Sequence, residues 1–386
     1  MSAIGIGPLA GVRVVELAGL GPAPFAAMVL ADLGAEVVRV DRPAGVGAAR
    51  QDVVNRGKRS VAVDLKAPGG RDLVLGLIQR ADVLIEGFRP GVAERLGLGP
   101  AACAERNRRL VYGRMTGWGQ QGPLAKVAGH DIDYIALTGA LWASGRAEER
   151  PVPALNLVGD YAGGSMFLVM GVLAALLEVG RSGEGQVIDA AMVDGASVLT
   201  TMFTALQGMG VWRAERGANV FDTGSPFYEV YACADGRWVA VGALEPQFYA
   251  ELVRLTGFLA GSPDEVRFVQ PAPADWPAHK AIWERLWRTR TRNEWTALLG
   301  HTDACVQPVL DWAERLEHPH LVERGTFVEL DGTVQPAPAP RLSRTPGAIS
   351  RRPPVPGEHT REVAAEAGLD AAAIDALLAS GAVMQA

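Results

Sequence analysis

The chain carries one histidine and one aspartate in settings that suit proton transfer. His130 follows Gly129 and precedes Asp131, and Asp160 ends the segment Asn-Leu-Val-Gly-Asp about thirty residues later. Each of the two leads toward an apolar, helix-like run, so each is expected near a helix N-terminus, where free backbone N–H groups face a ligand. Two acid/base groups aimed at one carbon from opposite sides could remove a proton on one face and return one on the other.

Simpler interpretations of these residues stay open on spacing alone. A single histidine is more often structural than catalytic, and an aspartate beside glycines could serve only as a helix N-cap. Burial would raise the pKa of Asp160 and a helix N-terminus would lower it, and such opposing effects suit an acid/base group or a nucleophile. Glu245 follows a predicted strand and precedes Pro246, so it could cap the next helix or orient a histidine.

Composition and charge narrow the class of protein. The 386 residues are 48% hydrophobic and 21% charged, which is ordinary globular composition with room for two domains. A net charge of −6 argues against general nucleic-acid binding, although a local basic patch for an anionic ligand stays possible. The three cysteines lie far apart without a CxxC pair, so neither a disulfide framework nor a zinc site is indicated, and a cytoplasmic location is expected.

Two further features bear on location and metals. No signal peptide is expected at the N-terminus. The longest apolar run, 166–177, is shorter than a membrane span, so we expect a buried helix and no membrane partner. The pair His318 and His320 has no third ligand nearby in the sequence, and no metal site is predicted.

Strand and helix patterns alternate through the first half of the chain. This alternation predicts an α/β fold, with a Rossmann-like parallel sheet covered by helices on both faces. The predicted strands are 12–17, 36–40, 60–65, 81–86, 110–115 and 186–190, and the predicted helices are 25–33, 70–80, 100–106 and 192–207. The first turn resembles a dinucleotide site, but Pro24 stands where a third glycine is needed and Arg42 suits a phosphate better than a ribose, which disfavours NAD.

The composition changes in the second half of the chain. Two apolar runs, 227–233 and 237–242, flank an Asp-Gly pair, which is a strong hairpin signal. Helical patterns follow at 248–256, 280–288 and 291–299. We therefore predict a large domain over 1–200, a linker helix region over 201–224 and a small α+β domain over 225–334. The Pro/Arg-rich stretch 335–356 is expected to be a linker that leads to two short helices within 361–378, and 335–386 would complete the large domain.

Basic residues gather near the predicted sheet. Arg42, Lys66 and Arg89 each lie just past the carboxyl end of a predicted strand. Ligands bind at that edge in open parallel sheets, and a phosphate-bearing ligand would use several such residues. A solvated basic face is the alternative.

Six segments, which include His130, Asp160 and Glu245, resemble the family III CoA-transferase superfamily, and within it the α-methylacyl-CoA racemases. The resemblance covers nearly the whole chain from Leu9, and His130, Asp160 and Glu245 stand in the settings that the family leads one to expect. The segments are 12–43, 81–92, 129–141, 156–171, 185–195 and 243–249.

The resemblance implies an isomerase that interconverts (R)- and (S)-2-methylacyl-CoA thioesters through an enolate. His130 and Asp160 would be the two acid/base groups, and Asn156 would support them. Glu245 would come from the partner subunit of an interlocked homodimer and hydrogen-bond to the histidine. Asp131, at a predicted helix start, is placed to donate its backbone N–H to the enolate oxygen. No metal or redox cofactor would be needed, because coenzyme A is part of the substrate.

The resemblance also assigns residues to the acyl-CoA. Arg42 would hold the phosphate end. Apart from the resemblance, the acyl chain needs only an apolar surface, which could include Met166, Met170, Met192, Met202 and Met209, although a role in the core is the simpler interpretation of these methionines. The adenine site would comprise Val63, Asp64, Leu65 and Lys66; the diphosphate and pantetheine site Gly87, Phe88, Arg89 and Arg95; and the residues beside the histidine Gly129, Ile132, Asp133 and Tyr134.

Two alternatives remain. A CoA-transferase of the same superfamily would use Asp160 as a nucleophile that forms an acyl anhydride and then a CoA thioester. A non-catalytic acyl-CoA-binding protein would need Arg42 and Arg89 but neither acid/base group. His130 and Glu245 favour the racemase.

Overall fold

The computed structural model describes residues 7–43 and 50–386, which form two compact units. The large unit contains the described residues up to Thr138, together with Ala154–Thr200 and Glu323–Ala386. The small unit contains Gly139–Pro153 and Thr201–Val322. This division differs from the sequence-based one at 139–153 and at 323–334, which the sequence placed in the large and the small domain, respectively.

The large unit is built on a seven-stranded sheet with the order β12-β3-β2-β1-β4-β5-β6. The strands are β1 Arg13–Leu17, β2 Glu36–Asp41, β3 Lys58–Val63, β4 Val83–Glu86, β5 Val111–Thr116, β6 Val187–Ala191 and β12 Val383–Met384. Every neighbouring pair is parallel except β12 with β3. The order 3-2-1-4-5-6 is that of a doubly wound Rossmann-like sheet. The predicted fold class is confirmed.

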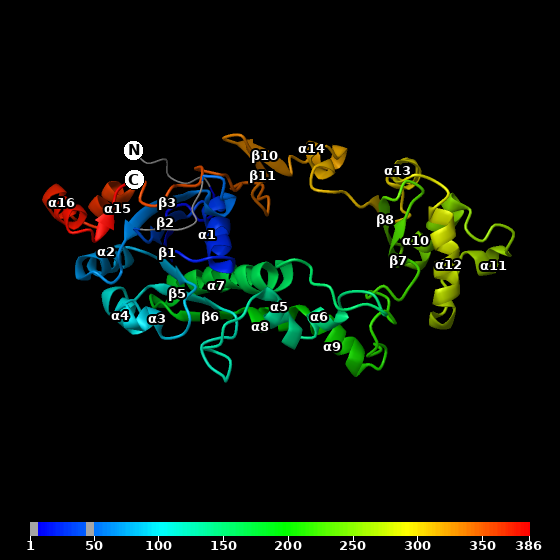
Figure 1. The fold of residues 1–386 in the computed structure, drawn as a ribbon, viewed down its shortest axis with the longest axis horizontal. Coiled ribbons are helices and arrows are strands. Elements are labelled where there is room, and N and C mark those ends of the chain that lie inside the picture. The colour runs from blue at the N-terminus through cyan, green and yellow to red at the C-terminus, as the bar shows by residue number, and fades with distance from the viewer. Residues whose placement is uncertain (1–6, 44–49) are drawn as a thin grey trace. The chain divides into compact units, whose positions relative to one another are not determined.

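Helices cover both faces of this sheet (Figure 1). On one face, α1 and α7 bury residues such as Leu30 and Val172 against β1, β4 and β5. On the other face, α2, α4, α15 and α16 pack residues such as Ile78 and Val363 against β2 and β3. The helices are α1 Pro22–Asp32, α2 Pro68–Ile78, α3 Val92–Arg95, α4 Pro100–Arg106, α5 Asp131–Leu137, α7 Phe167–Ser182, α8 Met192–Leu199, α15 Thr360–Glu366 and α16 Ala371–Ala379. Short elements complete the unit: the 3-10 turn Val53–Asn55 and the hairpin of β10 Phe327–Leu330 and β11 Thr333–Pro336.

The helix that carries Asp160 begins earlier than the apolar pattern predicted. A π-helical segment, Leu157–Met166, runs directly into α7. A Cβ added at Gly195 of α8 would lie 1.8 Å from the carbonyl oxygen of Gly163, so the two helices meet backbone to backbone. The apolar run was therefore right about α7 but missed the preceding helical turns, where glycines stand in place of large apolar side chains.

The combined helix Leu157–Ser182 is 26 residues long. Among the described helices it is the one whose length and composition would allow it to cross a membrane, and 44% of its apolar window is buried inside the protein. It is thus longer than the run of 166–177 from which a short, buried helix was expected. Because Leu168, Val172 and Val179 lie in the core beside the sheet, we interpret it as a core helix.

The small unit contains an antiparallel sheet with the order β7-β8-β9. Its strands are β7 Tyr228–Ala232, β8 Trp238–Gly242 and β9 Val306–Pro308, so the predicted hairpin is confirmed. A core that includes Trp283, Trp287 and Trp295 lies against these strands. The helices are α6 Ala140–Ala143, α9 Thr201–Gly208, α10 Pro246–Thr256, α11 Asp264–Arg267, α12 Trp276–Trp287, α13 Arg292–Leu299 and α14 Pro319–Glu323, with 3-10 turns at Pro273–Asp275 and Glu314–Leu316.

One predicted helix is wrong. The apolar stretch 192–207 forms two helices, α8 and α9, which are separated at Thr200 and belong to different units. Apolar periodicity reported the helical conformation but not the break, because no proline or glycine marks it.

Candidate active site

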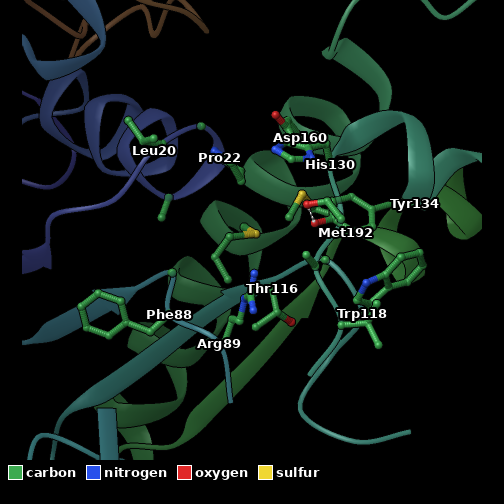
Figure 2. Close-up of a pocket in the computed structure, with 18 of the residues that line it drawn as sticks. Leu20, Pro22, Phe88, Arg89, Thr116, Trp118, His130, Tyr134, Asp160 and Met192 are labelled. Atoms are coloured by element: carbon green, nitrogen blue, oxygen red, sulfur yellow. Dashed lines mark hydrogen bonds between the residues drawn. The ribbon is translucent and has the colours of Figure 1, made fainter. Parts of the chain in front are cut away.

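A cavity of about 460 Å³ lies at the carboxyl edge of the large sheet (Figure 2). Its walls are the turn after β1, the loop after β4, the end of β5 and the start of α8. Strands β1 and β4 are the neighbours at which the strand order reverses. Open α/β sheets bind their ligands at this switch point, so the topology itself marks the cavity as the candidate site.

His130 and Asp160 both line this cavity. His130 is the residue before α5, and its backbone N–H donates to Oδ2 of Asp133 at 2.9 Å. Asp160 lies in the first turn of the π-helical segment, after Asn156 at the N-cap position. The side chains of His130 and Asp160 lie next to each other in Figure 2, and the charge of His130 lowers the pKa of Asp160. The structure therefore brings the two predicted acid/base groups together.

The surroundings of Asp160 favour its protonated form. Burial raises the pKa of this half-buried carboxyl group, and the negative charge of Asp131 raises it further. The amide Nδ2 of Asn156 donates to Oδ2 of Asp160 at 3.0 Å and lowers the pKa, as does the charge of His130. Desolvation is the largest of these effects, so the pKa is raised overall, which suits a group that must both hold and release a proton.

Asp131 contributes more than the sequence analysis assigned to it. Its backbone N–H, the expected enolate donor, has no hydrogen-bond acceptor within residues 7–43 and 50–386. Its side chain is buried, and Oδ2 accepts the backbone N–H groups of Gly159 at 2.6 Å and Asp160 at 2.8 Å. No sequence pattern links these positions, because the contact depends on how two helices pack.

A second pocket, of about 360 Å³, adjoins the first through Arg89 and Pro90. Arg95 and Lys126 also line it. In the part of the chain that the structure describes, none of these three cations forms an ion pair with a carboxylate. Three uncompensated positive charges around one pocket favour an anionic ligand. Lys126 was missed in the sequence analysis, although its place four residues before His130 was a usable signal.

A buried glutamate, which the sequence analysis also missed, fixes the loop after β4 through hydrogen bonds. Glu86 is fully buried, and its Oε2 accepts the backbone N–H of Phe88 at 2.6 Å. Its Oε1 accepts Nε of Arg114 at 2.9 Å, and Arg114 in turn binds Glu94 of α3. Glu86 thereby fixes the loop from which Gly87, Phe88 and Arg89 line the cavity.

The residues beside the histidine divide between the cavity and its support. Gly129 and Tyr134 line the cavity, and the hydroxyl of Tyr134 donates to the carbonyl oxygen of Gly129. Burial raises the pKa of Tyr134 to about 12, so this hydroxyl stays neutral. Ile132 is exposed, and Asp133 holds the backbone of His130.

The residues assigned to adenine and to the phosphate end lie at or just after the ends of β2 and β3, at the same edge of the sheet. Arg42 and Lys66 are exposed there and line neither of the two pockets. Oδ1 of Asp64 accepts the backbone N–H of Lys66 at 2.9 Å. Val63 is 1% exposed and, with Leu65 packed beside it, belongs to the core under α2, so its side chain is not available to a ligand.

Glu245 belongs to the small unit, where it is the exposed residue directly before α10 and makes no side-chain cap to that helix. Of the methionines considered for the acyl surface, Met192 lines the cavity, as does Met115. Met166, Met170, Met202 and Met209 are exposed. Within the described residues, no three His, Cys, Asp or Glu side chains are grouped so that they could hold a metal ion.

Comparisons with known proteins identify the family of the chain. Residues 9–360 match the family model for CoA-transferase family III. The chain is 48% identical to the alpha-methylacyl-CoA racemase of Mus musculus and 46% identical to that of Homo sapiens, in each case over 93% of both chains. Among solved structures, a CAIB/BAIF family protein from Brucella suis superposes with a TM-score of 0.81 at 26% identity, over 94% of this chain and all of that one. The chain belongs to CoA-transferase family III.

Proposed function

We propose that this protein is a 2-methylacyl-CoA racemase that interconverts (R)- and (S)-thioesters by 1,1-proton transfer. The observation that carries the proposal is the presence of His130 and Asp160 on the wall of one cavity at the switch point of the sheet. The identity of 46–48% to two proteins named alpha-methylacyl-CoA racemase supports the same reaction.

The two groups divide the chemistry between them. The α-proton of a thioester is weakly acidic, and its removal leaves an enolate. Neutral His130 takes the proton from the (S)-epimer, and protonated Asp160 returns a proton to the opposite face of the same carbon. For the (R)-epimer the roles reverse, so each turnover leaves the pair ready for the other epimer. The raised pKa of Asp160 supports this assignment, because an aspartate with the usual pKa would be almost fully deprotonated at neutral pH.

The enolate oxygen needs a preorganised donor. The backbone N–H of Asp131 is free among the described residues and stands at the N-terminus of α5, next to His130. A hydrogen bond from this group, aided by the positive end of the helix, stabilises the developing negative charge.

The coenzyme A moiety extends from this cavity across the carboxyl edge of the sheet. The pocket lined by Arg89, Arg95 and Lys126 binds the diphosphate. The negative charges of the diphosphate pair with these three cations, which have no carboxylate partner among the described residues. Arg42 binds the phosphate end, and the turn that follows β3 borders the adenine. The apolar wall with Met115 and Met192 supports the start of the acyl chain.

Assembly and location extend the proposal. We place Glu245 of the partner subunit at His130 in an interlocked homodimer, a role for which its exposed position before α10 leaves it free. The reaction uses no metal or redox cofactor, since proton transfer alone accounts for it. The three cysteines are free thiols, which supports a location in the reducing cytoplasm.

The runner-up is a CoA-transferase in which Asp160 attacks the thioester. That reaction needs a carboxylate but no base beside it, so the pairing of Asp160 with His130 counts against it. The same pairing counts against a non-catalytic acyl-CoA-binding protein.

The test is to incubate the purified protein with (S)-2-methyldecanoyl-CoA, with and without a free carboxylic acid, and to resolve the epimers and the thioesters by chromatography. We expect an approach to an equal mixture of epimers without an acceptor acid. Transfer of CoA to the added acid without epimerisation would assign the protein to the transferases. Binding of the thioester without either reaction would indicate a non-catalytic acyl-CoA-binding protein.

A further inference from the structure

We propose that the carboxylate of Asp131 is a positioning residue that sets Asp160 against His130. The inference rests on the proposed racemase function and adds to it a device that holds the two acid/base groups in register. Asp131 follows His130 directly at the start of α5, and its side chain reaches the start of the helix that carries Asp160. One residue therefore ties together the helix ends that present the two groups.

The contacts are those of a helix cap supplied from another helix. The first N–H groups of a helix have no partner within it. Asn156 occupies the N-cap position of the π-helical segment but makes no side-chain cap to it, because its amide is turned to Asp160. Oδ2 of Asp131 takes over this function by accepting the N–H groups of Gly159 and Asp160 at 2.6 and 2.8 Å. The backbone of Asp160 is thus held by Asp131, and its carboxyl group by Asn156.

The packing leaves no freedom at this junction. Asp131 is 5% exposed, and a Cβ added at Gly159 would lie 2.7 Å from its Oδ2. Only glycine at residue 159 allows the carboxylate to come this close. On the other side of Asp160, a Cβ added at Gly21 would lie 3.4 Å from Oδ2 of Asp160. The glycines at 21 and 159 therefore fit around the two carboxylates.

The charge of Asp131 also acts on Asp160. Oδ1 of Asp131 is buried and has no hydrogen-bond partner in the described structure, and no cation among the described residues forms an ion pair with this carboxylate. The other groups that face Asp160 are the imidazole of His130, the residue before α5, the neutral amide of Asn156, the neutral phenol of Tyr134 and the uncharged turn at Gly21. Asp131 is thus the one negative neighbour of Asp160 in the described structure, and it favours the protonated form.

Two variants separate positioning from charge. Asp131→Ala removes both, whereas Asp131→Asn keeps an oxygen that can accept the two N–H groups and removes only the charge. Because a misplacement of about 1 Å can cost about 100-fold in rate, we expect Asp131→Ala to slow racemisation by about 10- to 100-fold. Deuteration of the (S)-epimer with retained configuration, which needs His130 alone, should stay within about threefold of the native rate.

Asp131→Asn should recover racemisation to within about tenfold of the native rate, and the acidic limb of its pH profile should move to lower pH. The sign follows from the loss of a negative neighbour, which lowers the pKa of Asp160.

Gly159→Ala tests position without charge, because the added methyl group displaces the carboxylate of Asp131 and leaves its charge in place. This variant should slow racemisation as Asp131→Ala does. Asp82→Asn is the matched control, since Asp82 also accepts a backbone N–H, that of Arg13, but precedes β4 at the opposite edge of the sheet.

Three results would overturn the proposal. If Asp131→Ala racemised at the native rate, the carboxylate of Asp131 would not position Asp160. An equal loss of racemisation and of (S)-epimer exchange would indicate general damage to the site. A third contradiction would be an Asp131→Asn variant that racemises as slowly as Asp131→Ala and whose pH profile does not move. The acceptor oxygen would then not restore the position of Asp160, and the charge of Asp131 would not affect its pKa. Failure of the proposed function itself is recognised separately, because the native protein would then neither racemise nor exchange.

Discussion

Replacement of Asp160 by asparagine gives the sharpest test of the acid/base assignment. The change keeps the size of the side chain and removes its ability to exchange a proton. A positioned general acid or base contributes about 100- to 10,000-fold to a rate. The surroundings place the expected loss in the upper part of that range. The carboxylate of Asp131 is buried and does not line the cavity, and the hydroxyl of Tyr134, with a pKa of about 12, donates to a carbonyl oxygen, so neither can replace Asp160.

We therefore expect Asp160→Asn to slow racemisation in both directions by about 1,000- to 10,000-fold, or about 4 to 5.5 kcal/mol of activation free energy. The two directions fall together because each needs both groups. The (S)-epimer should still exchange its α-proton for deuterium with retained configuration, since His130 faces that proton. His130→Gln should give the mirror result, with exchange retained on the (R)-epimer only.

The assay follows both epimers in deuterated water by NMR after chiral separation. Asp82→Asn serves as the control for an aspartate-to-asparagine change away from the cavity. If Asp160→Asn racemised within tenfold of the native rate, or if it lost the exchange of both epimers alike, the assignment of one group to each face would be refuted.

Three further predictions concern binding and stability. Arg95→Ala combined with Lys126→Ala should raise KM for acyl-CoA about tenfold or more, with little change in kcat and a weaker dependence on salt, as steady-state kinetics at two ionic strengths will show. Lys58→Met should destabilise the large unit by about 3 to 5 kcal/mol in denaturant unfolding, because fully buried Lys58 binds fully buried Glu16 at 2.7 Å. Asp160→Asn should raise the unfolding midpoint at pH 7 to 8 but not below about pH 4: the pKa of Asp160 is raised in the fold, so its stabilising effect is present at low pH and is lost as the pH rises through that pKa.

The parallel sheet could be predicted from the sequence because buried strands carry their own signal. The apolar runs at 36–40 and 110–115 match β2 and β5 to within a residue. Patterns of this kind also place Arg42, Lys66 and Arg89 at the carboxyl ends of strands, since that depends only on where each strand stops. Apolar periodicity is least informative where glycine replaces side chains, which is why the helical turns before Met166 were missed.

The site could be predicted in part, for a related reason. His130 and Asp160 were recognisable by residue type and by their glycine-rich surroundings, and each lies at a helix start. The carboxylate of Asp131 and the support by Glu86 could not be found in this way. Both act through contacts between residues 28 or more positions apart or through a loop backbone, and such contacts exist only once the helices and strands are packed.

The distribution of deuterium between the two epimers at early times tests the central claim most directly. The native protein is given pure (S)-2-methyldecanoyl-CoA in deuterated water, and the reaction is stopped after a small fraction has turned over. If His130 and Asp160 act on opposite faces, the newly formed (R)-epimer carries more deuterium at the α-carbon than the recovered (S)-epimer, because Asp160 delivers a solvent-derived deuteron while His130 in part returns the proton that it removed. Equal labelling of both epimers from the first time point would mean that one group serves both faces, and it would contradict the account.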